Sequence, residues 1–224
     1  MEILADVSLR RTSLRDQVLR AIRNGLVTGQ IVPGVVYSAA ALASELGVSN
    51  SPVREAMLAL VDEGLMEVVP NRGYRPVTLT AADTAEIIQL RELLEVPAVG
   101  LAAEGDISEV HAALENLVGV IEQTAAAGDI AGNLDADREF HLLLAGAGGN
   151  RRLASLVASL RDQARLYNLR HLAESGELRA SAAEHRPLLQ AVASGDGPLA
   201  ERLMRAHLGH LTTDWSAPTE GGRQ

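Results

Sequence analysis

The chain has 224 residues, enough for one or two domains, and with 47% hydrophobic and 22% charged residues it has the composition of a globular protein. It contains no cysteine, which excludes disulfides and thiolate chemistry, and no run of about 18 apolar residues, which excludes a membrane span. The net charge of −9 lies entirely in residues 80–224 (12 Arg against 21 acids), because residues 1–79 balance 8 Arg against 8 acids.

The first predicted element is an amphipathic helix that follows Ser13 and ends near Gly29, with apolar residues at every fourth position. The arginines of this region suit either a solvated face or contacts with phosphates; they are Arg10, Arg11, Arg15, Arg20 and Arg23. Residues 32–34 then turn the chain, and residues 35–37 (Val-Val-Tyr) are expected to form a short strand.

Residues 42–65, L-A-S-E-L-G-V-S-N-S-P-V-R-E-A-M-L-A-L-V-D-E-G-L, predict a short helix, a tight turn at Gly47 and a second amphipathic helix. The buried side of the first helix should hold Leu42, Ala43 and Leu46, and Ser38 can cap it. Gly47 suits the left-handed conformation in which helices often end. This pattern is typical of a helix-turn-helix, although any pair of antiparallel helices can imitate it.

The second helix can be capped by Ser49 or Ser51 and leaves Asn50, Ser51 and Arg54 near its exposed N-terminal end. Such side chains suit phosphate oxygens and base edges in a DNA major groove. Residues 66–69, a turn at 70–73 and residues 74–77 then predict a β-hairpin, with Arg72 at its tip. An arginine in this place can reach a minor groove, while the alternative is a plain hairpin turn.

Residues 42–65 together with P-N-R-G-Y at 70–74 resemble the winged helix-turn-helix of the GntR family of bacterial transcription regulators. The resemblance implies binding of double-stranded operator DNA and assigns a DNA-contacting role to Arg54. Family members often have Arg where this chain has Asn50, which can hydrogen-bond a base, preferably adenine, but adds no charge. The candidate DNA-binding residues are Ser49, Asn50, Ser51, Arg54 and Arg72.

From residue 80 onward nearly every segment has helical period. A capping-box-like start at Thr80–Asp83 opens the first of six helices, which contains Pro97. The others are predicted to begin at Ser108, Asp129, Asn150, Glu177 and Pro198. Six helices with short connections predict an antiparallel bundle, so the fold class is mainly α: a winged helix-turn-helix followed by a helical bundle.

Four side chains of this bundle are candidate metal ligands. Asp137 and His141 lie one helical turn apart, while His185 and His207 come from two later helices and lie in or beside apolar patterns. Imidazole nitrogens with one carboxylate suit Zn, Ni, Mn or Fe better than Ca or Mg. Taken singly, each His favours a hydrogen-bonded structural role over a ligand role, so spacing alone does not establish a metal site.

Three segments, D-A-D-R-E-F-H-L-L-L-A-G-A-G-G-N-R-R-L, E-H-R-P-L-L-Q-A-V-A-S-G-D and A-E-R-L-M-R-A-H-L, are similar to the FCD ligand-binding domain of the FadR-type branch of the same family. The resemblance implies a divalent transition metal (Zn, Ni or Mn) on Asp137, His141, His185 and His207, with a small organic acid as effector. It also assigns Arg91 as a clamp for the acid, the alternative being a surface ion pair with Glu95. Arg165 and Asn168 are further candidates to line the effector cavity.

We therefore expect a homodimeric, ligand-responsive transcription regulator that is not an enzyme. Its domains would be residues 1–79 for DNA binding, 80–215 for metal, effector and dimerisation, and 216–224 as a flexible tail. A regulator whose helical domain binds its effector without metal is one alternative. A metal-dependent enzyme is another, although no general base or nucleophile accompanies the ligands. The N-terminus lacks an apolar signal segment, so we expect a cytoplasmic protein without membrane contact.

Overall fold

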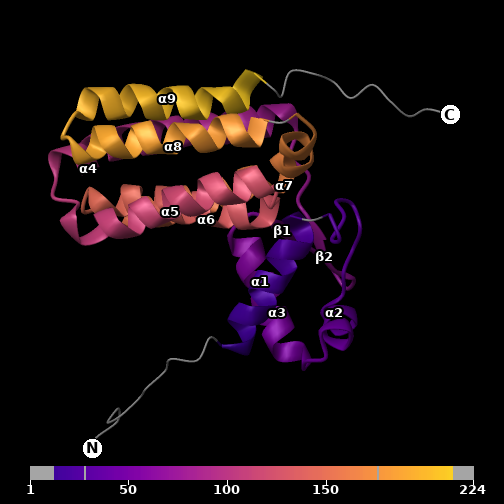
Figure 1. Ribbon diagram of the computed structural model, residues 1–224. Coiled ribbons are helices and arrows are strands. Elements are labelled where there is room, and N and C mark those ends of the chain that lie inside the picture. The colour runs from indigo at the N-terminus through magenta and orange to yellow at the C-terminus, as the bar shows by residue number, and fades with distance from the viewer. Residues whose placement is uncertain (1–12, 28, 176, 214–224) are drawn as a thin grey trace, which may run out of the picture. The chain divides into compact units, whose positions relative to one another are not determined.

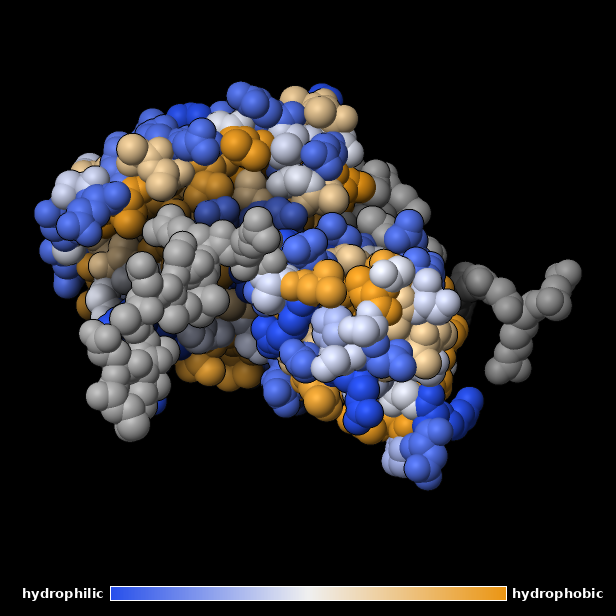
Figure 2. All heavy atoms as spheres, turned by 90° about the horizontal axis from the view of Figure 1, so that it is seen from below, coloured by the Kyte–Doolittle hydropathy of each residue, from blue (hydrophilic) through white to orange (hydrophobic). Residues whose placement is uncertain are grey.

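The computed structural model describes residues 13–27, 29–175 and 177–213; within them, the side chains of residues 27, 165–175, 177 and 210–213 lie outside the description. The chain divides into two compact units, Met1–Val77 and Thr78–Gln224. The fold is mainly helical with one two-stranded sheet (Figure 1), which confirms the predicted fold class. The surface visible in Figure 2 mixes hydrophilic and hydrophobic residues. Among the described helices, none is both long and apolar enough to cross a bilayer.

In its described residues, the first unit contains three helices and a hairpin. Its elements are α1 (Leu14–Val27), α2 (Ala39–Leu46), α3 (Asn50–Asp62), β1 (Met66–Val69) and β2 (Gly73–Pro76). Helix α3 packs against both α1 and α2. The apolar positions at four-residue spacing on α1, Val18, Ile22 and Leu26, are buried as their period predicts. On α3, Met57 and Leu60 are completely buried, so the helix is fixed by one face and exposes the other.

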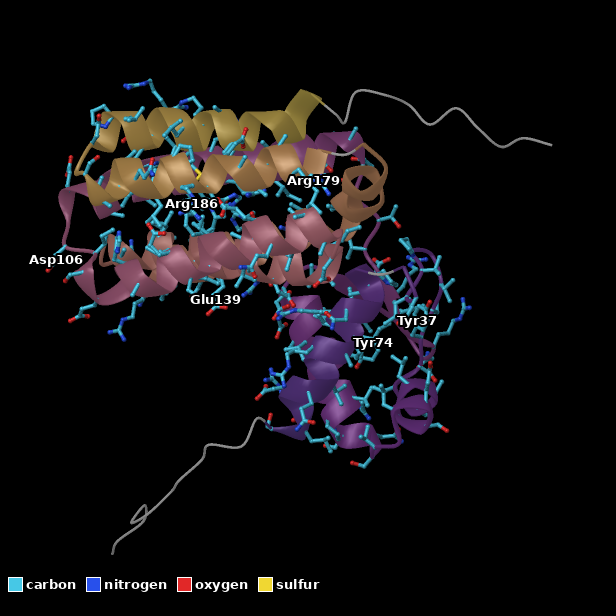
Figure 3. All side chains as sticks on the ribbon, viewed as in Figure 1. Tyr37, Tyr74, Asp106, Glu139, Arg179 and Arg186 are labelled. Carbon is cyan, nitrogen blue, oxygen red and sulfur yellow. The ribbon has the colours of Figure 1, made fainter. Side chains whose placement is uncertain are left out.

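The strand expected at residues 35–37 does not form. Within the described residues of this segment, Tyr37 makes a single antiparallel bridge to Tyr74 of β2, with N–O distances of 2.7 and 2.9 Å; both tyrosines are labelled in Figure 3. Gly73 permits this close approach, because a Cβ there would lie 2.3 Å from the carbonyl oxygen of Tyr37. Val35 is exposed, so no apolar face holds this segment in a sheet over a longer stretch.

The second unit is a bundle of six described helices, as predicted. They are α4 (Ala81–Glu104), α5 (Ser108–Ala127), α6 (Ile130–Ala147), α7 (Arg151–Ser175), α8 (Glu177–Ala193) and α9 (Gly197–Thr213). The predicted N-terminal signals are observed at Thr80, Asp129 and Asn150, whose side-chain oxygens each accept a hydrogen bond from a backbone N–H of the first turn. Helix α6 ends two residues later than expected, at Ala147, inside the glycine-rich run.

The helices pack so that α8 contacts both α5 and α9, and α4 contacts α6, α7, α8 and α9 (Figure 1). Phe140, Leu144, Leu188 and Met204 are among the buried residues of the common core. Arg186 lies on the side of α8 that faces α5 (Figure 3), where it pairs with Glu122 at 2.7 Å. The bundle thereby brings the interior faces of α4, α6, α8 and α9 together, which is where the candidate ligands lie.

Candidate functional site

The turn between α2 and α3 is built by the residues that the sequence indicates. Ser38 is the N-cap of α2 and accepts a hydrogen bond from the backbone N–H of Ala41, while Gly47 ends that helix with φ 67°. Leu42 and Ala43 are buried, but Leu46 is 38% exposed, so its assignment to the buried side was wrong. Leu46 is the last residue of α2, directly before the left-handed turn at Gly47.

The N-terminal end of α3 presents polar side chains to solvent. Ser49 occupies the N-cap position but makes no side-chain cap hydrogen bond, and Ser51 instead donates to Glu55 at 2.9 Å, so neither serine caps α3 as expected. Asn50 and Arg54 are exposed. One helical turn apart, Asn50 and Arg54 form a surface with hydrogen-bonding groups and one positive charge, of the kind that binds phosphates and base edges.

The hairpin that follows provides a second exposed arginine. Strands β1 and β2 pair antiparallel, Val69 opposite Gly73, with Asn71 in a left-handed conformation (φ 60°) in the turn. Arg72 is exposed in this turn. The hairpin therefore has the form of the predicted wing, with Arg72 at its tip.

The second unit brings four candidate metal ligands together. Asp137 and His141 come from α6, His185 from α8 and His207 from α9. One ligand atom from each lies within 4.8 Å of one from each of the others. The three imidazoles are buried, with ring centroids between 4.8 and 5.3 Å apart, and Phe140 packs edge-on against two of them. Four helical residues that lie up to 70 positions apart in sequence thus face one common centre.

The donor set fits a divalent transition metal. Neither ring nitrogen of His141, both buried, makes a hydrogen bond of good geometry among the described residues, although Nδ1 lies 3.3 Å from Oε2 of Glu95. A metal–nitrogen bond would satisfy Nε2. Burial lowers the pKa of His141 well below its usual value, and burial also lowers the pKa of His207. Both imidazoles are then neutral near pH 7, the form in which a ring nitrogen has a lone pair for a metal.

Two buried arginines and a buried glutamate lie beside these ligands. Arg161 of α7 donates to Glu95 through Nε at 2.9 Å and to Asp137 through Nη1 at 2.8 Å. Arg91 of α4 donates through Nε to the other oxygen of Glu95 at 2.7 Å. The pair of Arg91 and Glu95 therefore exists, but only 4% and 2% of these side chains are exposed, so its description as a surface pair was wrong.

These arginines fix the protonation of the two carboxylates. Burial alone would raise the pKa of Glu95, but Arg161 and then Arg91 hold it well below its usual value. Burial likewise opposes ionisation of Asp137, but the effects of Arg161, then of His185 and His141, together hold the pKa of Asp137 well below the usual range. Asp137 is thus a carboxylate near neutral pH, as a metal ligand must be.

Sequence reasoning missed Arg161 as a member of this cluster, because its partner Glu95 lies 66 positions away and nothing local pairs them. Glu95 was considered only as a partner of Arg91. Two other candidates, Arg165 and Asn168, lie on α7, but their side chains are outside the described residues.

Comparisons with known proteins cover both units. Residues 14–75 match the model of bacterial regulatory proteins of the GntR family, and residues 86–210 match the FCD domain. The chain is 34% identical over 202 residues to an uncharacterized HTH-type transcriptional regulator in an unstable DNA locus of Streptomyces ambofaciens, covering 88% of this chain and 83% of the relative. It is 30% identical to a probable D-xylose utilization operon transcriptional repressor of Paenarthrobacter nicotinovorans, covering 89% and 88%. Among solved structures, E. coli McbR/YncC superposes with a TM-score of 0.79 at 26% identity, covering 92% of this chain and 98% of that one.

Proposed function

Because this chain belongs to the GntR family of bacterial regulatory proteins and carries an FCD domain, we propose that it is a homodimeric regulator that senses a small carboxylate at a metal site. Residues 1–79 bind operator DNA, and residues 80–215 bind metal and effector and form the dimer. Residues 216–224, expected as a tail, lie outside the described residues. The observation that carries the sensing half is the convergence of Asp137 and three buried imidazoles in the second unit. The relatives are named as transcriptional regulators, and an enzymatic role finds no support in them.

For DNA binding, the exposed end of α3 enters the major groove, where Ser49, Asn50, Ser51 and Arg54 contact phosphates and bases. Arg72 of the hairpin turn reaches the adjacent minor groove. Residues 1–79 have no net charge. The proposal is therefore supported by the local placement of these two exposed arginines and not by the net charge of the domain.

For sensing, Asp137, His141, His185 and His207 hold Zn, Ni or Mn. When bound, the metal supplies a Lewis-acid centre with open coordination positions for a carboxylate. The buried charges of Arg91 and Arg161 are balanced by Glu95 and Asp137, and burial lowers the pKa of His141 and of His207. A divalent cation added to this balanced interior leaves an excess of positive charge, which favours an anionic effector.

Arg91, Arg165 and Asn168 orient the effector in this proposal. Arg91 is buried on the side of α4 that holds Glu95, and only its Nε is committed to Glu95 by a described hydrogen bond. A guanidinium that donates through Nε still presents two terminal nitrogens, which suit a carboxylate. Arg165 follows Arg161 by one helical turn on α7, and Asn168 follows Arg165 by three residues.

The homodimer is supported by an apolar stripe of exposed leucines on α4 and by one exposed leucine on α7. On α4, Leu90, Leu93 and Leu101 are 47%, 64% and 50% exposed, and on α7 Leu156 is 56% exposed. Large exposed apolar side chains on one helix face mark interaction surfaces. Helices α4 and α7 also contact each other. A second copy of the chain covers this stripe and presents two recognition helices to a pseudo-palindromic operator, whose affinity the effector alters by a population shift.

The test titrates the full-length protein into labelled DNA from upstream of its own gene, with metal and a panel of small organic acids. We expect salt-sensitive binding, and one acid that changes the DNA affinity by about 5–150-fold, the usual range of allosteric coupling. Metal analysis of untagged protein purified without chelator separates this mechanism from a metal-independent one. Absence of specific binding under all conditions would refute the proposed regulator.

A further inference from the structure

The three candidate imidazoles share a feature beyond their convergence: each has an oxygen acceptor next to its Nδ1 atom. Nδ1 of His185 lies 3.1 Å from the backbone carbonyl oxygen of Ser181, one turn earlier in α8. Nδ1 of His207 lies 2.8 Å from Oε2 of Glu184. Nδ1 of His141 lies 3.3 Å from Oε2 of Glu95, an ion-pair contact whose angle is not that of a hydrogen bond. In all three rings, which come from three helices, Nδ1 therefore faces an oxygen atom.

The opposite nitrogens point toward the common centre. Nε2 of His185 lies 3.0 Å from Oδ1 of Asp137, and Nε2 of His141 lies 3.7 Å from the same oxygen. A neutral imidazole has one N–H and one lone pair. Once a metal takes the lone pair of Nε2, the N–H lies on Nδ1, where the oxygen acceptor stabilises it. For His207, the contact of Nδ1 with Glu184 leaves Nε2 as the nitrogen free to act as a ligand.

We infer that Glu184 and Glu95 are positioning residues, which hold His207 and His141 so that all three histidines bind the metal through Nε2. This inference rests on the proposed metal site and names residues that neither the ligand set nor the sequence pattern includes. Carboxylate acceptors behind ligating histidines fix the tautomer and the ring orientation and make the imidazole a stronger donor. Glu184 and Glu95 supply this carboxylate to two of the rings, and a backbone carbonyl serves the third.

Helix geometry explains how α8 provides both a ligand and an orienting group. Glu184 and His185 are consecutive, so their side chains leave the helix about 100° apart. Helix α8 packs against α9 as well as against α5. His185 points into the bundle and is 1% exposed, while the partly exposed side chain of Glu184 reaches His207 on α9. Two adjacent residues thereby connect two of the ligand-bearing helices.

Glu184 is the better residue for a test, because Glu95 also pairs with two buried arginines and its removal would unbalance their charges. The experiment measures Zn²⁺ and Ni²⁺ affinity of the full-length protein by competition with a chelating dye. It compares the wild type with Glu184→Ala and Glu184→Gln. The matched control is Glu115→Gln, which removes a carboxylate that pairs with Arg186 on the bundle surface instead of with an imidazole.

We expect Glu184→Ala to weaken metal binding by about 10–100-fold, the usual effect of losing such a partner. Glu184→Gln should lose less metal affinity, because its amide oxygen still accepts the Nδ1–H. The metal affinity of Glu115→Gln should match that of the wild type. Unchanged affinity of Glu184→Ala, in a wild type that binds metal, overturns this inference and leaves the metal site standing. A wild type that binds neither ion overturns the metal site and this inference together.

A second measurement reads the tautomers directly and covers Glu95 as well. In the Zn²⁺-loaded wild type, long-range ¹H–¹⁵N spectra of the histidine rings distinguish Nδ1–H from Nε2–H. We expect His141, His185 and His207 each to show a protonated Nδ1 and a metal-bound Nε2. In Glu184→Ala the signals of His207 alone should change, which a general loss of folding would not produce. Binding through Nδ1 by His141 or His207 overturns the inference.

Discussion

Asn50 and Arg54 lie one turn apart at the exposed start of α3, but they offer different chemistry. The guanidinium carries a charge that any phosphate can neutralise, whereas the amide can make a paired hydrogen bond to adenine. We therefore expect Arg54→Ala to weaken binding to all DNA sequences and to reduce the salt dependence of log K by about 1, and Asn50→Ala to relax the preference at one base pair. Fluorescence anisotropy at several salt concentrations measures both.

The control for these two variants is Glu45→Gln, an exposed change on α2 outside the candidate contacts. An Arg54→Ala protein with the wild-type affinity and salt slope would remove Arg54 from the DNA-binding residues. An Asn50→Ala protein with unchanged discrimination at every operator position would do the same for Asn50.

Arg161 shows how much one side chain in the interior can contribute. It is 4% exposed and serves both Glu95 and Asp137, so its removal leaves two buried carboxylates with too little compensating charge. We expect Arg161→Met to cost about 3–5 kcal/mol of unfolding free energy, measured by urea denaturation of the metal-free protein. The unfolding free energy of Arg161→Lys should lie between those of the wild type and Arg161→Met, because lysine keeps the charge but loses the planar fork of the guanidinium.

Arg152→Met on the same helix provides the comparison, since Arg152 is exposed, and its cost should be within about 0.5 kcal/mol of zero. If Arg161→Met were as stable as Arg152→Met, the buried network would contribute nothing to folding.

At the scale of single residues, the sequence predicts the candidate metal ligands better than the residues that contact them. Asp137 and His141 are recognisable because four residues separate them on one helix, and the FCD resemblance adds His185 and His207. The meeting of these four side chains agrees with that expectation, although their role as ligands stays a prediction. Arg161 and Glu184 could not be assigned, because their partners lie on other helices and depend on packing that no local pattern encodes.

At the scale of elements, several helix N-termini could be predicted, because a cap depends on neighbours within four residues, although neither Ser49 nor Ser51 caps α3. Ser38, Thr80 and Asn150 accept backbone N–H groups as expected. The predicted strand at 35–37 failed for the opposite reason. A strand needs a partner over several residues, and within the described segment only Tyr37 finds one.

The capping box at the start of α4 offers a direct test. Thr80 accepts from the backbone N–H of Asp83, whose carboxylate in turn accepts from the backbone N–H and the hydroxyl of Thr80. We expect Thr80→Ala to lower the stability of the second unit by about 1 kcal/mol, read from the urea midpoint of its helical circular dichroism signal. Thr78→Ala, at an exposed position before the helix, should change it little; equal effects of both variants would contradict the role of the cap.

The same box makes stability depend on pH in a defined direction. The hydroxyl and then the backbone N–H of Thr80 hold the pKa of Asp83 below its usual value of 3.8. A carboxylate with a lowered folded-state pKa stabilises the protein above its unfolded value, and this contribution disappears as the pH falls through the folded value. Asp83→Asn should therefore be less stable than the wild type near neutral pH, and the difference should shrink below pH 3.8. A constant difference across urea titrations from neutral to acid pH would contradict this.

For the whole molecule, charge is distributed between the same two parts to which we assign DNA binding and effector sensing. Residues 1–79 are neutral and residues 80–224 carry the entire net charge of −9, so the acidic part is repelled by DNA while the neutral part approaches it. Family resemblance predicts this two-part organisation from short motifs. Assembly depends on a surface, and the exposed leucines of α4 and α7 emerge only once the buried face of each helix is known.

Leu93 is the most exposed of these leucines, at 64%, and lies between Leu90 and Leu101 on the same side of α4. A charge there has to be desolvated if a second copy covers α4, but it costs nothing in a monomer. We therefore expect Leu93→Glu to shift the protein from dimer to monomer in sedimentation velocity and to weaken operator binding by about 100-fold, because the two half-sites are no longer bound together. Gln123→Glu, which adds the same charge at an exposed position on α5, should remain dimeric. A Leu93→Glu protein that stays dimeric would place the dimer interface on another face of the bundle, since a buried, unpaired carboxylate in the middle of the stripe is incompatible with stable association there.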